Sequence, residues 1–177
     1  HQVYLDDYYV GEFEVTNSQF MEFLNEYGNV NREYSIPTAD GLNRIVGPAS
    51  YIYPGASTQV IIEEGGRFIL HPDFPDYWDH PVESVLWFGA SIFCKTIGAR
   101  LPTEAEWEKA ARGTDGRIFP WGNRYVEGAA NTNAFNKHGQ IAGVGSYPMD
   151  RSPYGAYDMV GNVQEMVSDW WDSEYYF

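Results

Sequence analysis

Two carboxylates that flank a glycine turn are the residues in this sequence best suited to chemistry. Asp158 and Glu165 stand seven positions apart, with Gly161 and Val163 between them. Calcium in proteins takes about six to eight oxygen ligands from carboxylates, amides and backbone carbonyls. A tight turn at the glycine would direct the carbonyls of Gly161 and Val163 inward, while the two carboxylates close the shell. The spacing therefore predicts a structural calcium site in residues 158–165.

The remaining residue types show no spacing typical of a catalytic centre. The sequence has no glycine-rich phosphate loop, no nucleophile elbow and no pair of histidines at helical spacing. The single cysteine, Cys94, excludes an intrachain disulfide and a thiolate zinc site. We interpret Cys94 as a small core residue. The four histidines are widely scattered: His1, His71, His80 and His138.

Composition indicates one compact, acidic, aromatic-rich domain. A chain of 177 residues suits a single core, and its 17% aromatic content must mostly be buried or line a groove. The formal net charge of −14 argues against nucleic acid, which requires basic residues, and is compatible with divalent cations. No run of about 18 apolar residues is present, so we expect no membrane-spanning segment. We expect a monomer, and a single domain over residues 1–177 that is truncated at both ends.

Capping boxes mark two of the helices that must position these residues. Thr16 and Gln19 are spaced to satisfy each other's free amides, and helical spacing of apolar residues follows over 17–27. Thr103 and Glu106 repeat the pattern at the start of another helix, which we expect to end at a glycine, residue 113.

A further helix is expected between these two, after residues 80–82. Gly98 would end it. Its predicted apolar face consists of Ala90, Phe93, Cys94 and Ile97. Residues 59–62 and 67–70 are β-prone runs separated by a glycine-containing turn, which predicts a hairpin. Few helices, short strands and long loops together predict an α+β fold.

Four stretches, in order along the chain, resemble the formylglycine-generating enzyme and sulfatase-modifying factor family. The longest reads GARLPTEAEWEKAARG over 98–113, followed by RIFPWGN over 117–123. The others are EVTN at 14–17, HPV at 80–82 with Trp87, and GAYDMVGNVQE at 155–165 with SDWW at 168–171. The resemblance implies a variant of the C-type lectin fold, with two to three helices and a small twisted sheet.

The hallmark stretch has a mainly structural interpretation. Arg100 to Thr103 leads the chain into a capped helix, and Trp107 is expected to anchor that helix in the core. Glu104 and Glu106 are expected to be exposed first-turn carboxylates that complement the helix dipole, not an acid–base pair.

The resemblance implies two calcium sites. The first coincides with Asp158, Gly161, Val163 and Glu165. The second would use the side chain of Asn131, the carbonyls of Thr132 and His138, and Asn136, which stands where the family usually has an aspartate. Loss of that charge should weaken the second site. Calcium sites of modest affinity favour an extracytoplasmic location, periplasmic or secreted.

The activity that the resemblance implies is oxidation of a sulfatase cysteine to formylglycine, with copper held by two cysteines. Those cysteines follow the Trp-Trp region in the family, and nothing here matches them, so we expect this fragment to be inactive as an oxidase. We therefore predict no catalytic and no cofactor-binding residues in this fragment. Copper, and a sulfatase-type protein or peptide as partner, are expected only for a full-length parent.

Three interpretations of the parent stay open. It is a formylglycine generator, an iron enzyme oxidising sulfur–imidazole or other small substrates, or a non-catalytic lectin-like binding or structural module. The long insert over 34–79 departs from a minimal enzyme of the family and favours a diverged member with an unassigned activity.

Overall fold

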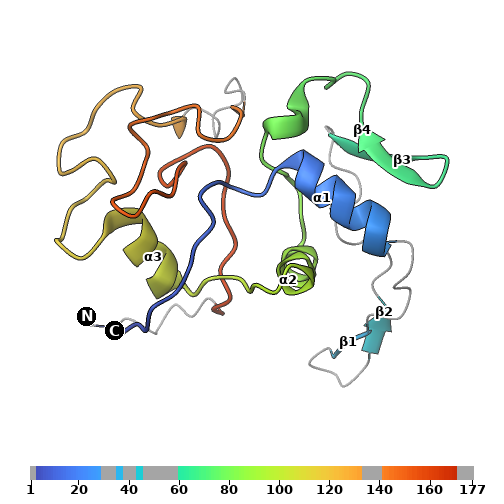
Figure 1. Ribbon diagram of the computed structural model, residues 1–177, viewed down its shortest axis with the longest axis horizontal. Coiled ribbons are helices and arrows are strands. Elements are labelled where there is room, and N and C mark those ends of the chain that lie inside the picture. Colours follow the sequence, from blue (N-terminus) through green and yellow to red (C-terminus); the bar gives the residue numbers. More distant parts are fainter. Residues whose placement is uncertain (1–2, 29–34, 38–42, 46–59, 133–140, 171–177) are drawn as a thin grey trace.

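Three α-helices, short antiparallel strands and long connecting segments make up the described part of the chain (Figure 1). The computed structural model describes residues 3–28, 35–37, 43–45, 60–132 and 141–170. The elements in order are α1 (Asn17–Phe23), a π-helical turn (Leu24–Gly28), β1 (Ser35–Pro37), β2 (Asn43–Ile45), β3 (Ile61–Glu64), β4 (Arg67–Leu70), a 3₁₀ turn (Tyr77–Asp79), α2 (Trp87–Thr96) and α3 (Glu104–Arg112).

The predicted hairpin is present as β3 and β4. The strands are antiparallel, with Ile61 opposite Leu70 and Glu64 opposite Arg67. The two-residue turn is Gly65-Gly66, with φ of 60° and 81°, a conformation that glycine adopts without a steric penalty. A second two-stranded sheet pairs β1 with β2, and neither sheet gains a third strand from the described ranges.

Both predicted capping boxes are formed. Thr16 Oγ1 accepts from the Gln19 amide at 3.3 Å, and Gln19 Oε1 accepts from the Thr16 amide at 3.0 Å. At α3, the Glu106 amide donates to Thr103 Oγ1 at 3.2 Å, and the Thr103 amide donates to Glu106 Oε2 at 2.8 Å. The helix predicted over 17–27 is α1 together with the π-helical turn that continues it.

Helix α2 confirms the predicted position but corrects one side chain. Phe93 is buried, and Ala90 and Cys94 are partly buried, as the spacing predicted. Ile97, predicted on the same face, is 63% exposed. The helix ends at Thr96, so Ile97 is the C-cap residue and no longer follows the helical periodicity.

The larger core joins α1, α2 and the hairpin. Its buried members are Phe20, Met21, Phe23, Leu24, Val60, Ile61, Phe68, Leu70 and Phe93. Phe93 of α2 contacts both Phe20 and Phe23 of α1, with ring centroids 5.6 Å apart in each case. Aromatic pairs at such separations stabilise beyond the area that they bury.

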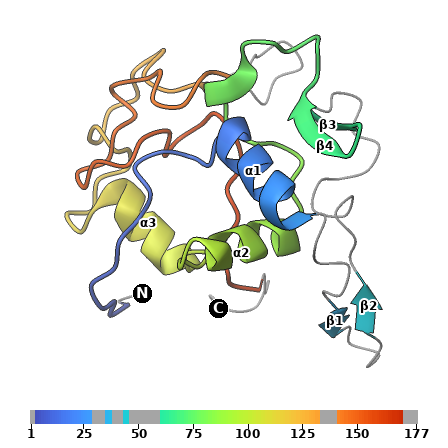
Figure 2. The ribbon, with the colours of Figure 1, turned by 45° about the vertical axis from the view of Figure 1, so that its right-hand side comes forward.

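The loops after α3 form the other half of the molecule, on the α3 side in both ribbon views (Figures 1 and 2). A smaller core there contains Ala110 and Ala111 of α3 with Ala156 and Met159. Residues 3–15 form no strand; they pass along α3 and these loops toward α1 (Figure 1). No helix in the described ranges is long and apolar enough to cross a bilayer.

Candidate metal centre

The predicted calcium loop, residues 158–165, is an irregular turn that is mostly buried over 158–162 and exposed at Gln164 and Glu165. Asp158 is 3% exposed and has φ of 61°, and Asn162 has φ of 65°. Positive φ is uncommon outside glycine, and Asn and Asp tolerate it best. The backbone amide of Gly145 donates to Asp158 Oδ2 at 2.6 Å.

The second predicted carboxylate, Glu165, is joined to the hallmark helix. The indole N–H of Trp107 in α3 donates to Glu165 Oε2. Trp107 also packs against the smaller core, as predicted for an anchor. Glu165 is exposed as a residue, and partial desolvation of its carboxyl group raises its pKa. The hallmark motif and the loop motif therefore form one unit.

Four carboxylates influence one another at this place. Burial raises the pKa of Glu14 to about 8, with Asp158 and Glu165 adding to the rise. Burial also raises the pKa of Asp150 to about 6, and the charge of Asp158 adds to it. Desolvation disfavours the charged form of each acid, and the like charges act in the same direction.

The four carboxylates have no basic partner in the described ranges. The ion pairs found there involve other acids: Asp73, Glu106, Glu108 and Asp115. The buried Oδ1 of Asp150 accepts no hydrogen bond, although its Oδ2 accepts from the Val160 amide at 3.1 Å. Buried carboxylates without a counter-charge are costly, and a bound cation is one way to compensate them.

The side chains alone do not make a metal cage. Within the described ranges, no three side chains of His, Cys, Asp or Glu stand close enough together to hold an ion. A cation at residues 158–165 would therefore need backbone carbonyls beside Asp158 and Glu165. This donor set of hard oxygen atoms suits calcium and does not suit a soft metal.

Half of the second predicted site lies against the first. Asn131 is buried, and a Cβ on Gly161 would stand 2.6 Å from the Asn131 carbonyl oxygen and 3.3 Å from the Thr132 nitrogen. Only glycine allows this approach. The other two predicted members, Asn136 and His138, lie outside the described residues.

Three residues of this centre were not identified from the sequence: Glu14, Asp150 and Asn162. Glu14 belongs to the EVTN motif, which was assigned to the start of α1, and Asn162 stands beside the predicted turn glycine. Asn162 Nδ2 donates to Glu14 Oε2 at 2.7 Å, and the Val163 amide donates to Glu14 Oε1 at 3.2 Å. The available signal was an asparagine next to the glycine of a predicted tight turn, a residue that tolerates positive φ.

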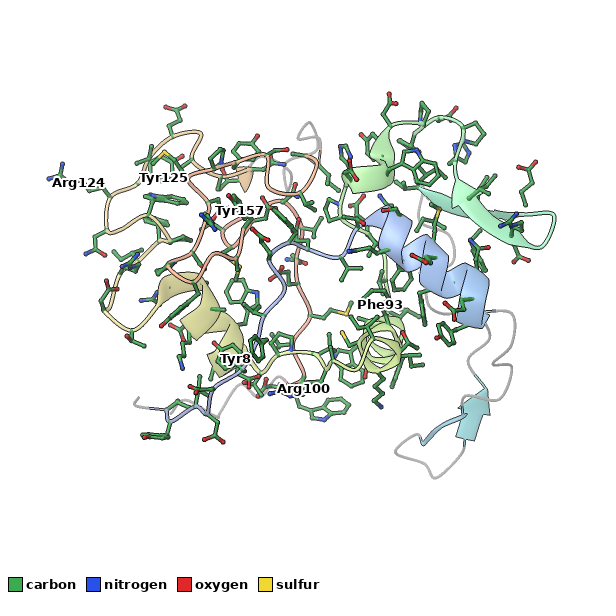
Figure 3. The ribbon with its side chains drawn as sticks, in the orientation of Figure 1. Tyr8, Phe93, Arg100, Arg124, Tyr125 and Tyr157 are labelled. Atoms are coloured by element: carbon green, nitrogen blue, oxygen red, sulfur yellow. The ribbon has the colours of Figure 1, made fainter. Side chains whose placement is uncertain are left out.

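The interpretation of Glu106 as an exposed dipole partner was wrong. Glu106 is 8% exposed, and Arg100 donates two hydrogen bonds to its carboxylate, at 2.7 and 2.6 Å. The Tyr8 hydroxyl donates to the Glu106 backbone carbonyl, so Tyr8 and Arg100 both bind Glu106 of α3 (Figure 3). Glu104 is exposed, as predicted, and its amide donates to Asp169 Oδ2 at 2.6 Å.

Comparison with known proteins shows which family carries these motifs. The profile of the family described as Sulfatase-modifying factor enzyme 1-like domain matches residues 1–177. The chain belongs to this family. It is 32% identical to the formylglycine-generating enzyme of Bos taurus over 189 residues, covering 96% of this chain and 50% of that protein. It is 33% identical to hercynine oxygenase of Mycolicibacterium smegmatis, over 95% of this chain and 38% of the relative.

Sulfatase-modifying-factor domains thus occur in proteins with different names. Serine/threonine-protein kinase pkn1 of Chlamydia pneumoniae is 34% identical over 99% of this chain and 25% of its own length. The chain spans about half the length of the formylglycine-generating enzyme that it matches, and less of the other two relatives. The α+β fold is the C-type-lectin-like variant of this family, and the family is of an oxidoreductase type. Membership defines the domain and not a single substrate.

Proposed function

We propose that this domain of a formylglycine-generating-enzyme-like protein is a calcium-stabilised scaffold, with the cation bound by residues 158–165. The observation that carries the proposal is the group of carboxylates described above: Glu14, Asp150 and Asp158 are buried, the partly desolvated carboxyl group of Glu165 interacts with them, and none of the four has a basic partner in the described ranges. Calcium would supply the missing positive charge.

Four groups of the chain would hold the cation. Asp158 and Glu165 would contribute carboxylate oxygens, and Gly161 and Val163 would contribute backbone carbonyls. Each carboxylate already has one oxygen fixed by a protein hydrogen bond, from Gly145 or from Trp107. Such outer hydrogen bonds orient metal ligands and limit the entropy that binding costs. The second site, with Asn131, Thr132, Asn136 and His138, is proposed on the family resemblance.

Calcium dependence of stability tests the proposal. A ligand that binds only the native state at 100 times its Kd stabilises by about 2.7 kcal/mol. For a chain of this size we expect calcium to raise Tm by roughly 5–10 °C over protein treated with a chelator. The double variant D158N/E165Q should lose the response. E127Q, which removes an exposed loop charge elsewhere, should keep it. Equal melting temperatures with calcium and chelator for the unmodified protein would refute the site.

The second candidate function is copper-dependent oxidation of a sulfatase cysteine. It is favoured by the identity with formylglycine-generating enzymes across 96% of this chain. Within these 177 residues the only thiol is that of Cys94, which is partly buried in α2. Burial raises its pKa, so it is a poor thiolate ligand. A copper site made of two cysteines would need thiols from outside this sequence.

Mass spectrometry tests the oxidase interpretation. The full-length natural protein, loaded with copper, would be incubated with oxygen and a cysteine-containing sulfatase peptide. Conversion of the peptide thiol to an aldehyde supports the oxidase. An unchanged peptide together with an intact calcium response argues against the formylglycine reaction and leaves the small-substrate iron enzyme and the binding or structural module.

A further inference from the structure

Asn162 is the most extensively hydrogen-bonded side chain of the candidate metal centre. Its Oδ1 accepts from Asn131 Nδ2 and from the Ala142 amide, both at 3.0 Å. Its Nδ2 donates to Glu14 Oε2 at 2.7 Å and to the Ala142 carbonyl at 3.1 Å. An asparagine side chain has two acceptor and two donor positions, so protein groups occupy all four. Asn162 therefore has no capacity left to bind a cation through its side chain.

These bonds connect segments that are distant in the sequence. Glu14 lies before α1, Asn131 lies in the loop after α3, and Ala142 lies beyond the residues that are not described. The Asn162 amide adds a bond to the Asn131 carbonyl at 3.1 Å. A single residue, Asn162, thus links the loop by hydrogen bonds to three other segments of the chain.

Asn162 stands between the two carbonyls assigned to the cation. The peptide unit that carries the Gly161 carbonyl ends at the Asn162 nitrogen, so rotation about φ of Asn162 turns that carbonyl. This φ is 65°. On the other side, the Val163 amide donates to Glu14, the acid that Asn162 also contacts, so the peptide unit that precedes the Val163 carbonyl is held in place.

We propose that Asn162 is the positioning residue of the calcium site, which fixes the directions of the Gly161 and Val163 carbonyls without touching the ion. The proposal rests on the calcium function proposed above. Asparagine is suited to this role because it tolerates positive φ and supplies both donors and acceptors. Aspartate would lose both donors, and glycine would keep the backbone conformation but lose all four side-chain bonds.

Terbium luminescence measures the site directly. Tb³⁺ substitutes for Ca²⁺ at oxygen sites and emits when a neighbouring indole is excited, and Trp107 is hydrogen-bonded to the proposed ligand Glu165. Titration with Tb³⁺ and competition with Ca²⁺ would be carried out on unmodified protein, N162A and N162G. Changing outer partners of metal ligands typically costs about 10–100-fold in affinity, and we expect a loss in this range for both variants.

A matched control separates positioning from general stability. The Asn25 side chain also makes two hydrogen bonds to backbone groups: it donates to the Phe68 carbonyl and accepts from the Phe68 amide. It is far from the loop in the sequence and lies against the hairpin. N25A should lower Tm in chelator while leaving the Tb³⁺ and Ca²⁺ affinities unchanged. If N162A does not fold, N162G carries the comparison, because it adds no backbone strain.

The outcomes are distinct. Loss of affinity in N162A and N162G, but not in N25A, supports the proposal. Unchanged affinity in both Asn162 variants overturns it while the calcium site stands. Normal affinity in N162G with weak binding in N162A also overturns it, because backbone conformation alone would then position the carbonyls. Absence of any Tb³⁺ or Ca²⁺ response in the unmodified protein removes the calcium function itself, and the positioning role with it.

Discussion

Glu106 has two roles at the start of α3. One of its oxygens caps the Thr103 amide, and the carboxylate as a whole receives a fork of two hydrogen bonds from Arg100. Arg100 is the main cause that lowers the pKa of Glu106 to about 2. The glutamate side chain is only 11% exposed, while that of Arg100 is 62% exposed. Solvent therefore screens the charge of Arg100 more than that of Glu106.

We expect E106Q to destabilise the protein by about 1–2 kcal/mol at pH 7, since glutamine keeps the capping bond but loses the charge-assisted bonds to Arg100. The folded-state pKa lies below the ordinary value of 4.5, so the carboxylate stabilises the fold above pH 4.5. This contribution is lost as pH falls toward about 2. Urea unfolding of both proteins from pH 7 to 2.5 checks this.

The control for this prediction is E108Q. Glu108 pairs with Arg112 one helical turn later, but both side chains are well exposed, at 60% and 40%. Such pairs contribute roughly 0.5 kcal/mol or less, so E108Q should change little at any pH. A difference between E106Q and the unmodified protein that persists undiminished at pH 2.5 would contradict the assignment of the pKa to Glu106.

At the scale of elements, local patterns predicted the helices and the hairpin but not the loops. The capping boxes at Thr16 and Thr103 and the Gly65-Gly66 turn are short-range signals, and all three are present. The carboxylates Asp158 and Glu165 were identified because their spacing is local too. Contacts such as Asn162 with Glu14 join residues 148 positions apart, and no periodicity records them.

The junction of α1 and α2 provides a prediction at this scale. Phe93 is 6% exposed and is the member of α2 that contacts two rings of α1. F93A would leave a cavity between the helices, and we expect it to cost about 3–5 kcal/mol. I97A removes the side chain of the α2 C-cap residue, which is 63% exposed, and should cost less than about 0.5 kcal/mol. Denaturant titration of the two variants measures both values, and equal costs would mean that α2 packs through another face.

For the whole molecule, the dominant feature is the excess of acid. The sequence has 25 acidic and 11 basic residues. The ion pair Glu108–Arg112, well exposed on both sides, contributes little at the surface, so screening it costs little. Repulsion among the acids that outnumber the basic residues opposes the compact state. Salt weakens both the attraction within ion pairs and the repulsion among acids, and we expect the weakening of repulsion to have the larger effect on stability.

We therefore expect sodium chloride to raise Tm of the protein in chelator. The Debye length shortens from about 30 Å at 0.01 M salt to about 8 Å at 0.15 M, which screens the longer-range repulsions first. Calcium chloride at equal ionic strength should raise Tm further, because site binding adds to screening. In D158N/E165Q the two salts should become equivalent. Calorimetric scans across both series test this: a Tm that falls with sodium chloride would show that attractive ion pairs, and not the net charge of −14, dominate the electrostatic energy of this fold.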